Sequence, residues 1–277
     1  MADEGVKAMK ITGTGHTDKG RLRPHNEDAL LVLPEAGVFA VADGMGGHAA
    51  GEVASRLAIE AVSEILSNDR EGSVPELLQQ AMEQANRKIS SVIERCPEFR
   101  GMGTTIVVAV TRGSQLWIGH LGDSRAYLVR DGALTQLTAD HSLVNELVRL
   151  GMLSREEAAQ DSRRNVVTRA LGSGSAVTPD VIDETIRGDD MILLCSDGLN
   201  TMLEDAAILE IAQDNAEDLA EVCRHLIAAA NDAGGEDNIT VVAFRAAQVS
   251  HSQAQAAAPE EVETQTAGGE QDELEME

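Results

Sequence analysis

Four short acidic blocks beside apolar runs constrain this chain of 277 residues more than any other feature. Each joins a carboxylate to turn-forming residues; the blocks are Asn26-Glu27-Asp28, Asp43-Gly44-Met45-Gly46-Gly47-His48, Ser196-Asp197-Gly198 and Gly235-Glu236-Asp237-Asn238. The last three follow or precede apolar runs that predict strands, so we expect their carboxylates at strand ends. Hard divalent cations are held by oxygen ligands of this kind. The pattern therefore predicts a fold that gathers distant acidic residues around two metal ions.

The surroundings of these carboxylates strengthen the metal hypothesis. Asp43 follows the apolar run 38–42, and Asp197 follows a second such run at 191–195. An Asp in apolar surroundings is normally paired or bound to metal, and clustered carboxylates repel one another unless a cation neutralises them. A plain turn at the strand end is the alternative for any single block, whereas the repetition favours metal.

The net charge of −25 argues against direct nucleic-acid binding, because phosphate backbones attract basic surfaces. A site for phosphate-ester hydrolysis, which is our hypothesis, then needs local positive charge from metal ions or from a placed Arg. Arg23 lies four residues before Glu27, and its guanidinium could grip the outer oxygens of a phosphate. A salt bridge to Glu27 or Asp28 is the alternative role for Arg23.

The three cysteines and the hydropathy pattern suggest an intracellular setting. Cys96, Cys195 and Cys223 are too few and too far apart to frame disulfides or a zinc motif, and none lies in a phosphate-cradling loop. This disfavours the phosphatases that use a cysteine nucleophile. No run is apolar enough to span a bilayer, and the first ten residues lack a secretory segment. We therefore expect a cytoplasmic protein without membrane contact.

We predict one α+β domain over residues 11–246, a flexible N-terminus at 1–10 and a disordered acidic tail at 247–277. Helical spacing of apolar residues predicts helices over 49–66, 74–93 and 216–230, the second starting at Ser73. Alternation predicts strands over 30–41, and the runs over 105–137 predict an antiparallel meander with turns at Arg112-Gly113, Gly122-Asp123 and Asp131-Gly132. Such an order suits antiparallel strands with helices outside.

Two segments differ from this pattern. Residues 141–165 are charged and only weakly periodic, which is typical of a functional lid or a subdomain inside a compact domain. The tail has no aromatic residue and, after Arg245, carries eight acidic residues and no Lys or Arg. It cannot bury enough apolar area to offset the entropy of ordering.

Further motifs accompany the acidic blocks in a fixed order from about Thr12 to Phe244. In sequence they are Arg23-x-x-Asn26-Glu27-Asp28, the Asp43 block continuing to Gly51-Glu52, Gly103-Thr104-Thr105, Gly122-Asp123-Ser124-Arg125-x-Tyr127, Asp140-His141-Ser142, Thr168-Arg169-Ala170-Leu171-Gly172, Ser196-Asp197-Gly198-Leu199 and Asp237-Asn238-x-Thr240. The ordered set resembles the metal-dependent type 2C (PPM) serine/threonine protein phosphatases in their bacterial form. Each motif is weak alone, whereas eight in order are specific.

The resemblance implies a four-layer α-β-β-α sandwich of two antiparallel sheets flanked by helices, with a flap at about 141–165 and two Mn²⁺ or Mg²⁺ ions at one end. By similarity, Asp43 bridges both metals, the Gly44 carbonyl binds one of them, and Asp197 and Asp237 bind the other. Asp123 anchors a third, looser ion. Glu27 and Asp28 hold metal-bound waters beside Asn238, and Arg23 binds the substrate phosphate.

The resemblance also implies hydrolysis of phosphoserine and phosphothreonine in proteins by a monomer that opposes a serine/threonine kinase in bacterial signalling. A water between two cations is acidic enough to lose a proton near neutral pH, and the resulting hydroxide would attack phosphorus directly, so no phosphoenzyme is needed. Two alternatives stay open: a catalytically inactive phosphoprotein-binding regulator, and a hydrolase of small phosphorylated molecules. The presence of every motif Asp and Arg disfavours the inactive regulator.

One position departs from the animal members of the family, which carry a His directly after the Asp-Gly pair to protonate the leaving group. Here that position is Met45. His25, His48 and His141 are the nearby candidates, and each also has a structural explanation. The general acid is therefore left open, with a metal-bound water as the default. The remaining histidines, His16, His120, His225 and His251, carry no functional prediction.

Overall fold

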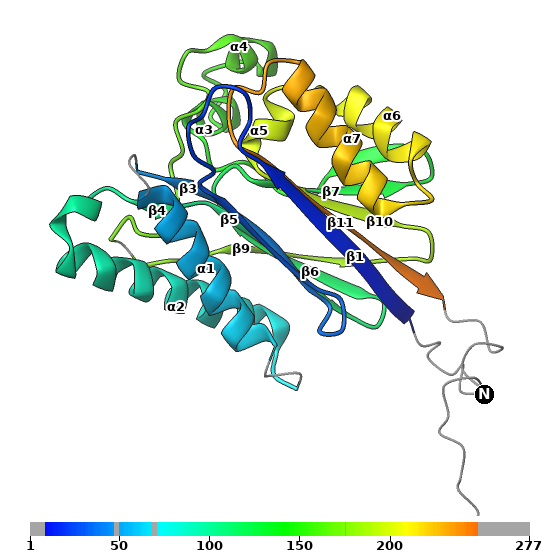
Figure 1. Cartoon of the computed structure of the whole chain (residues 1–277), viewed down its shortest axis with the longest axis horizontal. Coiled ribbons are helices and arrows are strands. Elements are labelled where there is room, and N and C mark those ends of the chain that lie inside the picture. Colours follow the sequence, from blue (N-terminus) through cyan, green and yellow to red (C-terminus); the bar gives the residue numbers. More distant parts are fainter. Residues whose placement is uncertain (1–8, 47–49, 68–70, 175, 249–277) are drawn as a thin grey trace, which may run out of the picture.

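The chain folds into two antiparallel sheets packed face to face, with helices on both outer surfaces (Figure 1). The structure, a computed structural model, describes residues 9–46, 50–67, 71–174 and 176–248. His48, the first eight residues and the tail from 249 onward lie outside the described residues, and what was predicted for them stays a prediction. The predicted α+β sandwich is confirmed.

The first sheet holds the beginning and the end of the domain side by side. Its strand order is β1-β11-β10-β7-β8, and all neighbouring strands are antiparallel. The strands are β1 (Met9–Asp18), β11 (Ile239–Gln248), β10 (Met191–Cys195), β7 (Arg125–Arg130) and β8 (Ala133–Gln136). Met9 pairs with Gln248, so β1 and β11 each extend two residues beyond the predicted domain limits of 11 and 246.

The second sheet has the order β2-β3-β5-β6-β9, with the short β4 paired to β3. Its strands are β2 (Asp28–Leu33), β3 (Val38–Met45), β4 (Gly103–Thr104), β5 (Ile106–Arg112), β6 (Gln115–Leu121) and β9 (Asp180–Thr185). The first five residues of β3 are completely buried. Both faces of β3 are covered, which explains why its sequence is continuously apolar rather than alternating.

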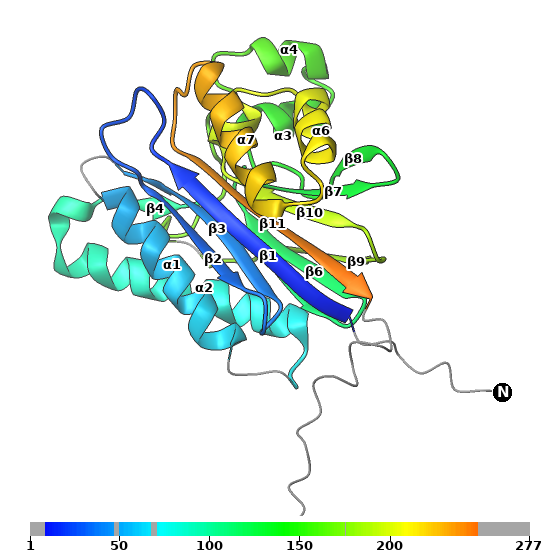
Figure 2. The ribbon, with the colours of Figure 1, turned by 45° about the vertical axis from the view of Figure 1, so that its right-hand side comes forward.

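Helices cover the two outer faces of the sandwich (Figure 2). The second sheet is covered by α1 (Ala50–Leu66) and α2 (Val74–Arg95), and the first by α5 (Asp197–Asn200), α6 (Asp205–Asp214) and α7 (Leu219–Asp232). The predicted helices are therefore confirmed with small shifts at their ends. The helix α2 begins directly after Ser73 as expected, although the Ser73 side chain makes no capping hydrogen bond. The helix α7 starts three residues later than predicted, because the Asp218 side chain accepts hydrogen bonds from the backbone amides of the first turn.

Three apolar layers hold these four structural layers together. One lies between α1, α2 and the second sheet, and includes Leu78 and Met82; another lies under α6 and α7 and includes Leu226. Between the sheets, the Phe39 and Phe244 rings stack with their centroids 4.1 Å apart. The sequence has few aromatic residues, so the rest of the core consists mostly of aliphatic side chains.

The predicted meander over residues 105–137 is wrong at one turn. The turns at Arg112-Gly113 and Asp131-Gly132 do join paired strands, β5 to β6 and β7 to β8. At Gly122-Asp123, however, the chain crosses from one sheet to the other, because β6 pairs with β9 and β7 pairs with β10. A tight turn between two apolar runs is compatible with either outcome, and only the packing of the sheets decides between them.

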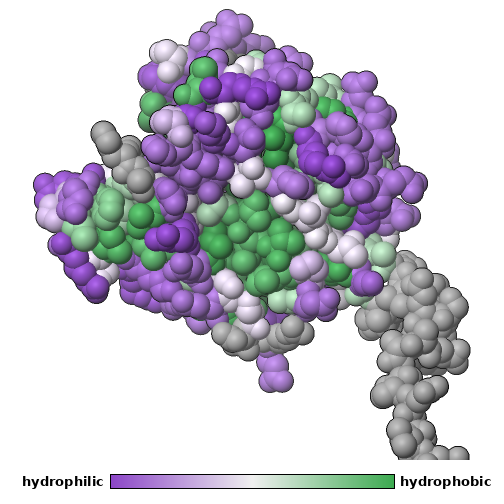
Figure 3. Space-filling model, in the orientation of Figure 1, coloured by the Kyte–Doolittle hydropathy of each residue, from purple (hydrophilic) through white to green (hydrophobic). Residues whose placement is uncertain are grey.

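The segment 141–165 contains two short helices, α3 (Leu143–Arg149) and α4 (Arg155–Gln160). Ser154 and Glu157 form a reciprocal capping box at the start of α4. In the view of Figure 3, hydrophilic side chains cover most of the surface, and apolar ones gather between α1 and β1, where the edges of the two sheets meet. Within the described residues, every helix is too short or too polar to cross a membrane.

Candidate metal centre

A cavity of about 270 Å³ opens at one end of the sandwich, where the acidic blocks meet. The residues that line it come from both sheets and from the loops between them: Arg23, Glu27, Asp43, Gly44, Met45, Gly46, Thr105, Asp123, Asn165, Val167, Asp197, Asp237 and Asn238. Almost all predicted site residues therefore converge, although their positions span more than 200 residues of sequence. Asp28 is the exception, since it lies just behind the wall of the cavity.

Asp28 and Asp43 stand opposite each other on the paired strands β2 and β3. The backbone carbonyl of Asp43 accepts hydrogen bonds from the Thr105 amide at 2.9 Å and the Thr104 hydroxyl at 2.8 Å. One carboxylate oxygen of Asp28 accepts from the Ser196 and Thr240 hydroxyls, at 2.8 and 2.6 Å. These bonds fix both acidic residues at the strand ends.

Gly44 extends β3 past Asp43 at a point where no side chain fits. A Cβ there would lie 2.1 Å from the Gly51 carbonyl oxygen at the start of α1 and 2.5 Å from that of Glu27. The close approach requires glycine, and it leaves the Gly44 backbone on the cavity wall, as the predicted ligand role needs.

Asp197 and Asp237 enter the cavity from the first sheet. Asp197 directly follows Ser196, the residue after β10, and is the first residue of α5. Asp237 precedes β11, and its carboxylate accepts a 2.6 Å hydrogen bond from the Arg23 guanidinium. The salt bridge considered for Arg23 is therefore made with Asp237, not with Glu27 or Asp28. The Arg23 side chain is half exposed, at the mouth of the cavity.

The electrostatics of the cluster favour a bound cation. Burial raises the pKa of Asp28 to about 7 and that of Asp197 to about 6, and repulsion by Asp237 adds to both shifts. Burial, followed by repulsion from Asp28 and Asp197, also raises the pKa of Asp43 well above its usual range. One buried oxygen of Asp28 and one of Asp197 have no hydrogen-bond partner among the described residues. A divalent cation would satisfy these oxygens and remove the repulsion, so the residues present fit Mn²⁺ or Mg²⁺.

Asp123 joins the centre from the crossing between the sheets. Burial and then repulsion from Asp197 raise its pKa to about 7. It also lines a second cavity, of about 520 Å³, beneath α3 and α4. The two cavities share Asp123, Asn165 and Asp197, so the space under the flap segment continues into the carboxylate cluster.

Asn238 holds a loop in place, and Glu27 lies on the cavity wall. The Asn238 side chain accepts from the Glu27 amide at 2.8 Å and donates to the carbonyls of Lys19 and His25, at 2.9 and 2.8 Å. Asn238 thus ties the loop that carries Arg23 to the end of the first sheet. Glu27 lines the cavity, where its carboxylate can reach water at the centre.

Sequence reasoning missed Asn165 and Val167, which come from the return of the flap segment and line the cavity. Their position just before the Thr168-Arg169 motif was the one available signal. No histidine of the described residues lines this cavity, and Met45 does. Cys195 and Cys223 are buried free thiols, and burial raises the pKa of each to about 12, so neither is an available nucleophile.

Comparison with known proteins gives a consistent set of relatives. The family described as Protein phosphatase 2C matches residues 14–239. The serine/threonine protein phosphatase PstP of Mycobacterium tuberculosis is 41% identical over 239 residues, which cover 86% of this chain and 46% of that protein. The chain therefore spans a little under half the length of that relative. The serine/threonine phosphatase stp of Listeria innocua is 40% identical over 233 residues, covering 82% of this chain and 92% of that protein.

A solved structure shows the same fold. It is the catalytic domain of the serine/threonine protein phosphatase PstP in complex with two manganese ions, and it matches with a TM-score of 0.80 and 38% identity. The match covers 87% of this chain and all of that domain.

Proposed function

This chain belongs to the protein phosphatase 2C family, and on that premise we propose that it hydrolyses phosphoserine and phosphothreonine in proteins with two bound Mn²⁺ or Mg²⁺ ions. The observation that carries the proposal is the convergence of Asp43, Asp123, Asp197 and Asp237 on one cavity. One buried oxygen of Asp197 and one of Asp28 behind it have no hydrogen-bond partner among the described residues. The manganese ions bound to the related catalytic domain support the same choice of metal.

We assign each residue of the cavity a role in binding metal or water. Asp43 would hold both ions, with Asp197 and Asp237 as further ligands of one ion and the Gly44 carbonyl as a ligand of the other. Asp123 would hold a third ion. The chemistry supplied by divalent ions bound in this way is the acidification of water near neutral pH and the neutralisation of phosphoryl charge. Glu27 and Asp28 would orient water at the centre by accepting hydrogen bonds from it.

Arg23 is the proposed anchor of the substrate phosphate. Its guanidinium stands at the cavity mouth beside Asp237, and a planar fork of donors suits the outer oxygens of a phosphate. Since it is half exposed, it can turn toward an incoming substrate without disturbing the core.

A protein substrate is supported by the space beneath α3 and α4. The cavity of about 520 Å³ leads away from Asp123 and Asp197, and Arg155 and Arg164 line it. That volume offers room for the residues that flank a phosphorylated side chain. The proposal includes a serine/threonine kinase as the source of these substrates, and a monomeric cytoplasmic protein. Light scattering on the purified chain would test the oligomeric state.

Turnover with and without metal tests the proposed function. The purified chain should release phosphate from phosphoserine and phosphothreonine peptides in Mn²⁺, and lose this activity in a chelator. Asp43→Asn should be inactive, whereas Asp214→Asn, a matched change on the exposed surface of α6, should not differ from the wild type.

Two outcomes would contradict the proposal. Binding of phosphopeptides without turnover in Mn²⁺ would favour the inactive regulator. Faster turnover of phosphorylated metabolites than of peptides would favour a small-molecule hydrolase.

A further inference from the structure

The pair Asp140-His141 contacts the chain on either side of Asp123, at Gly122 and at Arg125. Gly122 donates its amide hydrogen to Nδ1 of His141 at 3.0 Å, and the His141 amide donates to the Gly122 carbonyl at 2.9 Å. On the other side of Asp123, the Arg125 guanidinium donates three hydrogen bonds of 2.7 to 3.1 Å to the Asp140 carboxylate. The pair Asp140-His141 therefore brackets Asp123 between two sets of contacts.

His141 also stands at the base of the flap segment. Its carbonyl accepts from the Thr168 amide at 2.8 Å, and the next residue but one, Leu143, donates to the Val166 carbonyl at 2.8 Å. These bonds join the beginning and the end of the flap segment. The same histidine thus contacts the flap base on one side and the Asp123 turn on the other.

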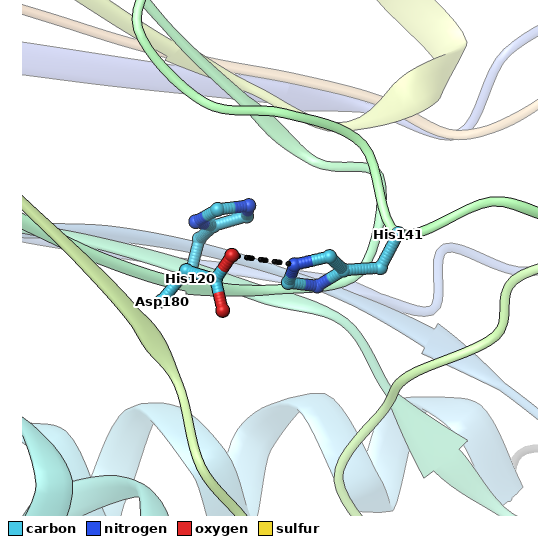
Figure 4. A group of neighbouring side chains, drawn as sticks. All are labelled: His120, His141 and Asp180. Atoms are coloured by element: carbon cyan, nitrogen blue, oxygen red, sulfur yellow. Dashed lines mark hydrogen bonds and ion pairs between the residues drawn. The ribbon is translucent and has the colours of Figure 1, made fainter. Parts of the chain in front are cut away.

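The contact with Gly122 decides the tautomer of the neutral His141 ring. Because the Gly122 amide can only donate, Nδ1 must accept, and the ring proton is then on Nε2, which lies close to both Asp180 and the Arg169 guanidinium. Nε2 lies 3.2 Å from the Asp180 carboxylate at the start of β9 (Figure 4). Arg169 donates to the other oxygen of Asp180 at 2.8 Å. Burial, followed by the neighbouring His120, lowers the pKa of His141, which keeps the ring neutral.

His120, His141 and Asp180 lie close enough to suggest a separate metal site, but their orientation argues against one. The two imidazole rings stack with centroids 4.5 Å apart and planes 13° apart, so their in-plane lone pairs cannot converge on one ion (Figure 4). The Arg169 guanidinium lies 2.7 Å from Nε2 of His141, where its positive charge would repel a cation. The group therefore supports the flap base.

We propose that His141 is a positioning residue for Asp123, which holds the turn at Gly122 and couples it to the base of the flap segment. Gly122 has φ = +110°, and a Cβ there would lie 2.4 Å from the Cβ of Thr105, so only glycine fits. Glycine is also the residue with the most backbone freedom, so the turn depends on outside contacts to stay fixed. The two bonds from His141 supply them. This inference rests on the proposed function, because Asp123 matters only if the centre binds metal.

Two substitutions of similar size separate positioning from simple packing. In His141→Asn the amide oxygen falls near the place of Nδ1 and can still accept from Gly122. In His141→Gln the amide group reaches the place of Nε2, which keeps a donor for Asp180 and loses the acceptor for Gly122. Loss of a partner that orients a metal ligand typically costs about 10-fold to 100-fold in metal affinity or activity. We therefore expect His141→Gln to lose about tenfold in turnover and in the affinity of its weakest Mn²⁺ site, and His141→Asn to stay within about threefold of the wild type.

Calorimetric titration with Mn²⁺ and turnover of a phosphopeptide would be measured on both variants, and on each combined with Asp123→Ala. If His141 acts through Asp123, His141→Gln should have no further effect once Asp123 is alanine. His225→Gln, a matched change at an exposed histidine of α7, should leave both measurements unchanged.

The inference would be overturned if His141→Asn and His141→Gln had equal effects. It would also be overturned if His141→Gln lowered turnover and Mn²⁺ affinity about tenfold further in the Asp123→Ala background. Either result would leave the proposed function intact. A wild-type protein without Mn²⁺-dependent turnover would overturn both.

Discussion

The two sides of the metal centre hold their charges in opposite ways. On the sandwich side Asp28 is buried, Asp43 and Asp197 are half-buried beside it, and burial and mutual repulsion raise the pKa values of all three. On the flap side, Asp140 and Asp180 at the flap base each have a cationic partner: Asp140 pairs with Arg125 at 2.7 Å, and Asp180 with Arg169 at 2.8 Å. Although burial acts in the opposite direction, the hydrogen bonds from Arg169 and His141 lower the pKa of Asp180.

The difference shows which side depends on metal. The sandwich side is an unbalanced cluster that a cation would complete, whereas the flap side is balanced by the protein alone. Buried charges are costly without partners, so an unbalanced cluster at a fixed site is better explained by function than by stability. Asp123 lies at the border between the two sides, and the effect of Asp123→Ala on Mn²⁺ binding shows to which side it belongs.

The largest effect is expected from neutralising the sandwich side. Asp43→Asn or Asp197→Asn should lower turnover in Mn²⁺ by at least about 10³-fold, or about 4 kcal/mol of transition-state stabilisation. Since each change also removes a repelling charge, the melting temperature in chelator should not fall. Phosphopeptide turnover and thermal unfolding would be measured on both variants, with Asp214→Asn as control. A variant that kept a tenth of wild-type turnover would contradict the ligand assignment.

Stability in chelator should depend on pH through the carboxyl groups of the cavity whose pKa values are raised. A carboxyl whose pKa is raised in the folded state binds a proton more tightly there than in the unfolded chain, so its contribution to stability is lost as pH rises through the folded pKa. With Asp28 and Asp123 at about 7 and Asp197 at about 6, the free energy of unfolding should fall between about pH 4 and pH 7. We expect a loss of several kcal/mol, which lowers the melting temperature by roughly 10 °C or more.

Mn²⁺ should raise the melting temperature and flatten this pH dependence, and Asp28→Asn should flatten it without metal. Asp180 adds nothing to the slope in this range, because its lowered pKa places its own titration in more acidic solution. A melting temperature in chelator that rose with pH over the same range would contradict the charge imbalance.

The contrast between the two sides also marks how far the sequence could be interpreted. The sandwich side was predictable, because an Asp after a buried strand is a local pattern that repeats at Asp43 and Asp197. The order of the motifs was enough to predict the two sheets and the flanking helices. The crossing at Gly122-Asp123 was not predictable, because a glycine turn between apolar runs fits a hairpin equally well. The pairing of Arg23 with Asp237 and the contact of His141 with Gly122 join residues far apart in sequence, and no local pattern encodes them.

A smaller effect is expected at Arg23, which stands between the unbalanced cluster and solvent. Its charged hydrogen bonds to a phosphate should be worth about 2 kcal/mol, so Arg23→Ala should lower kcat/KM for a phosphopeptide by roughly 30-fold. Arg23→Lys keeps the charge but loses the fork of donors, and should recover only part of this loss. Mn²⁺ affinity should change little in either variant. An unchanged kcat/KM for Arg23→Ala would assign the residue to its salt bridge with Asp237 alone.

The smallest effect is expected at Asp123, and it decides where the border between the two sides lies. If Asp123 holds only a third, weaker ion, Asp123→Ala should lower turnover by about tenfold, which is about 1.4 kcal/mol, and calorimetry should still detect two tightly bound Mn²⁺ ions. The reason is that Asp43, Asp197 and Asp237 keep their positions on strand ends that do not depend on the crossing between the sheets. Loss of all Mn²⁺ binding would instead make Asp123 part of the sandwich cluster, and the metal centre would then depend on the flap base for its basic structure.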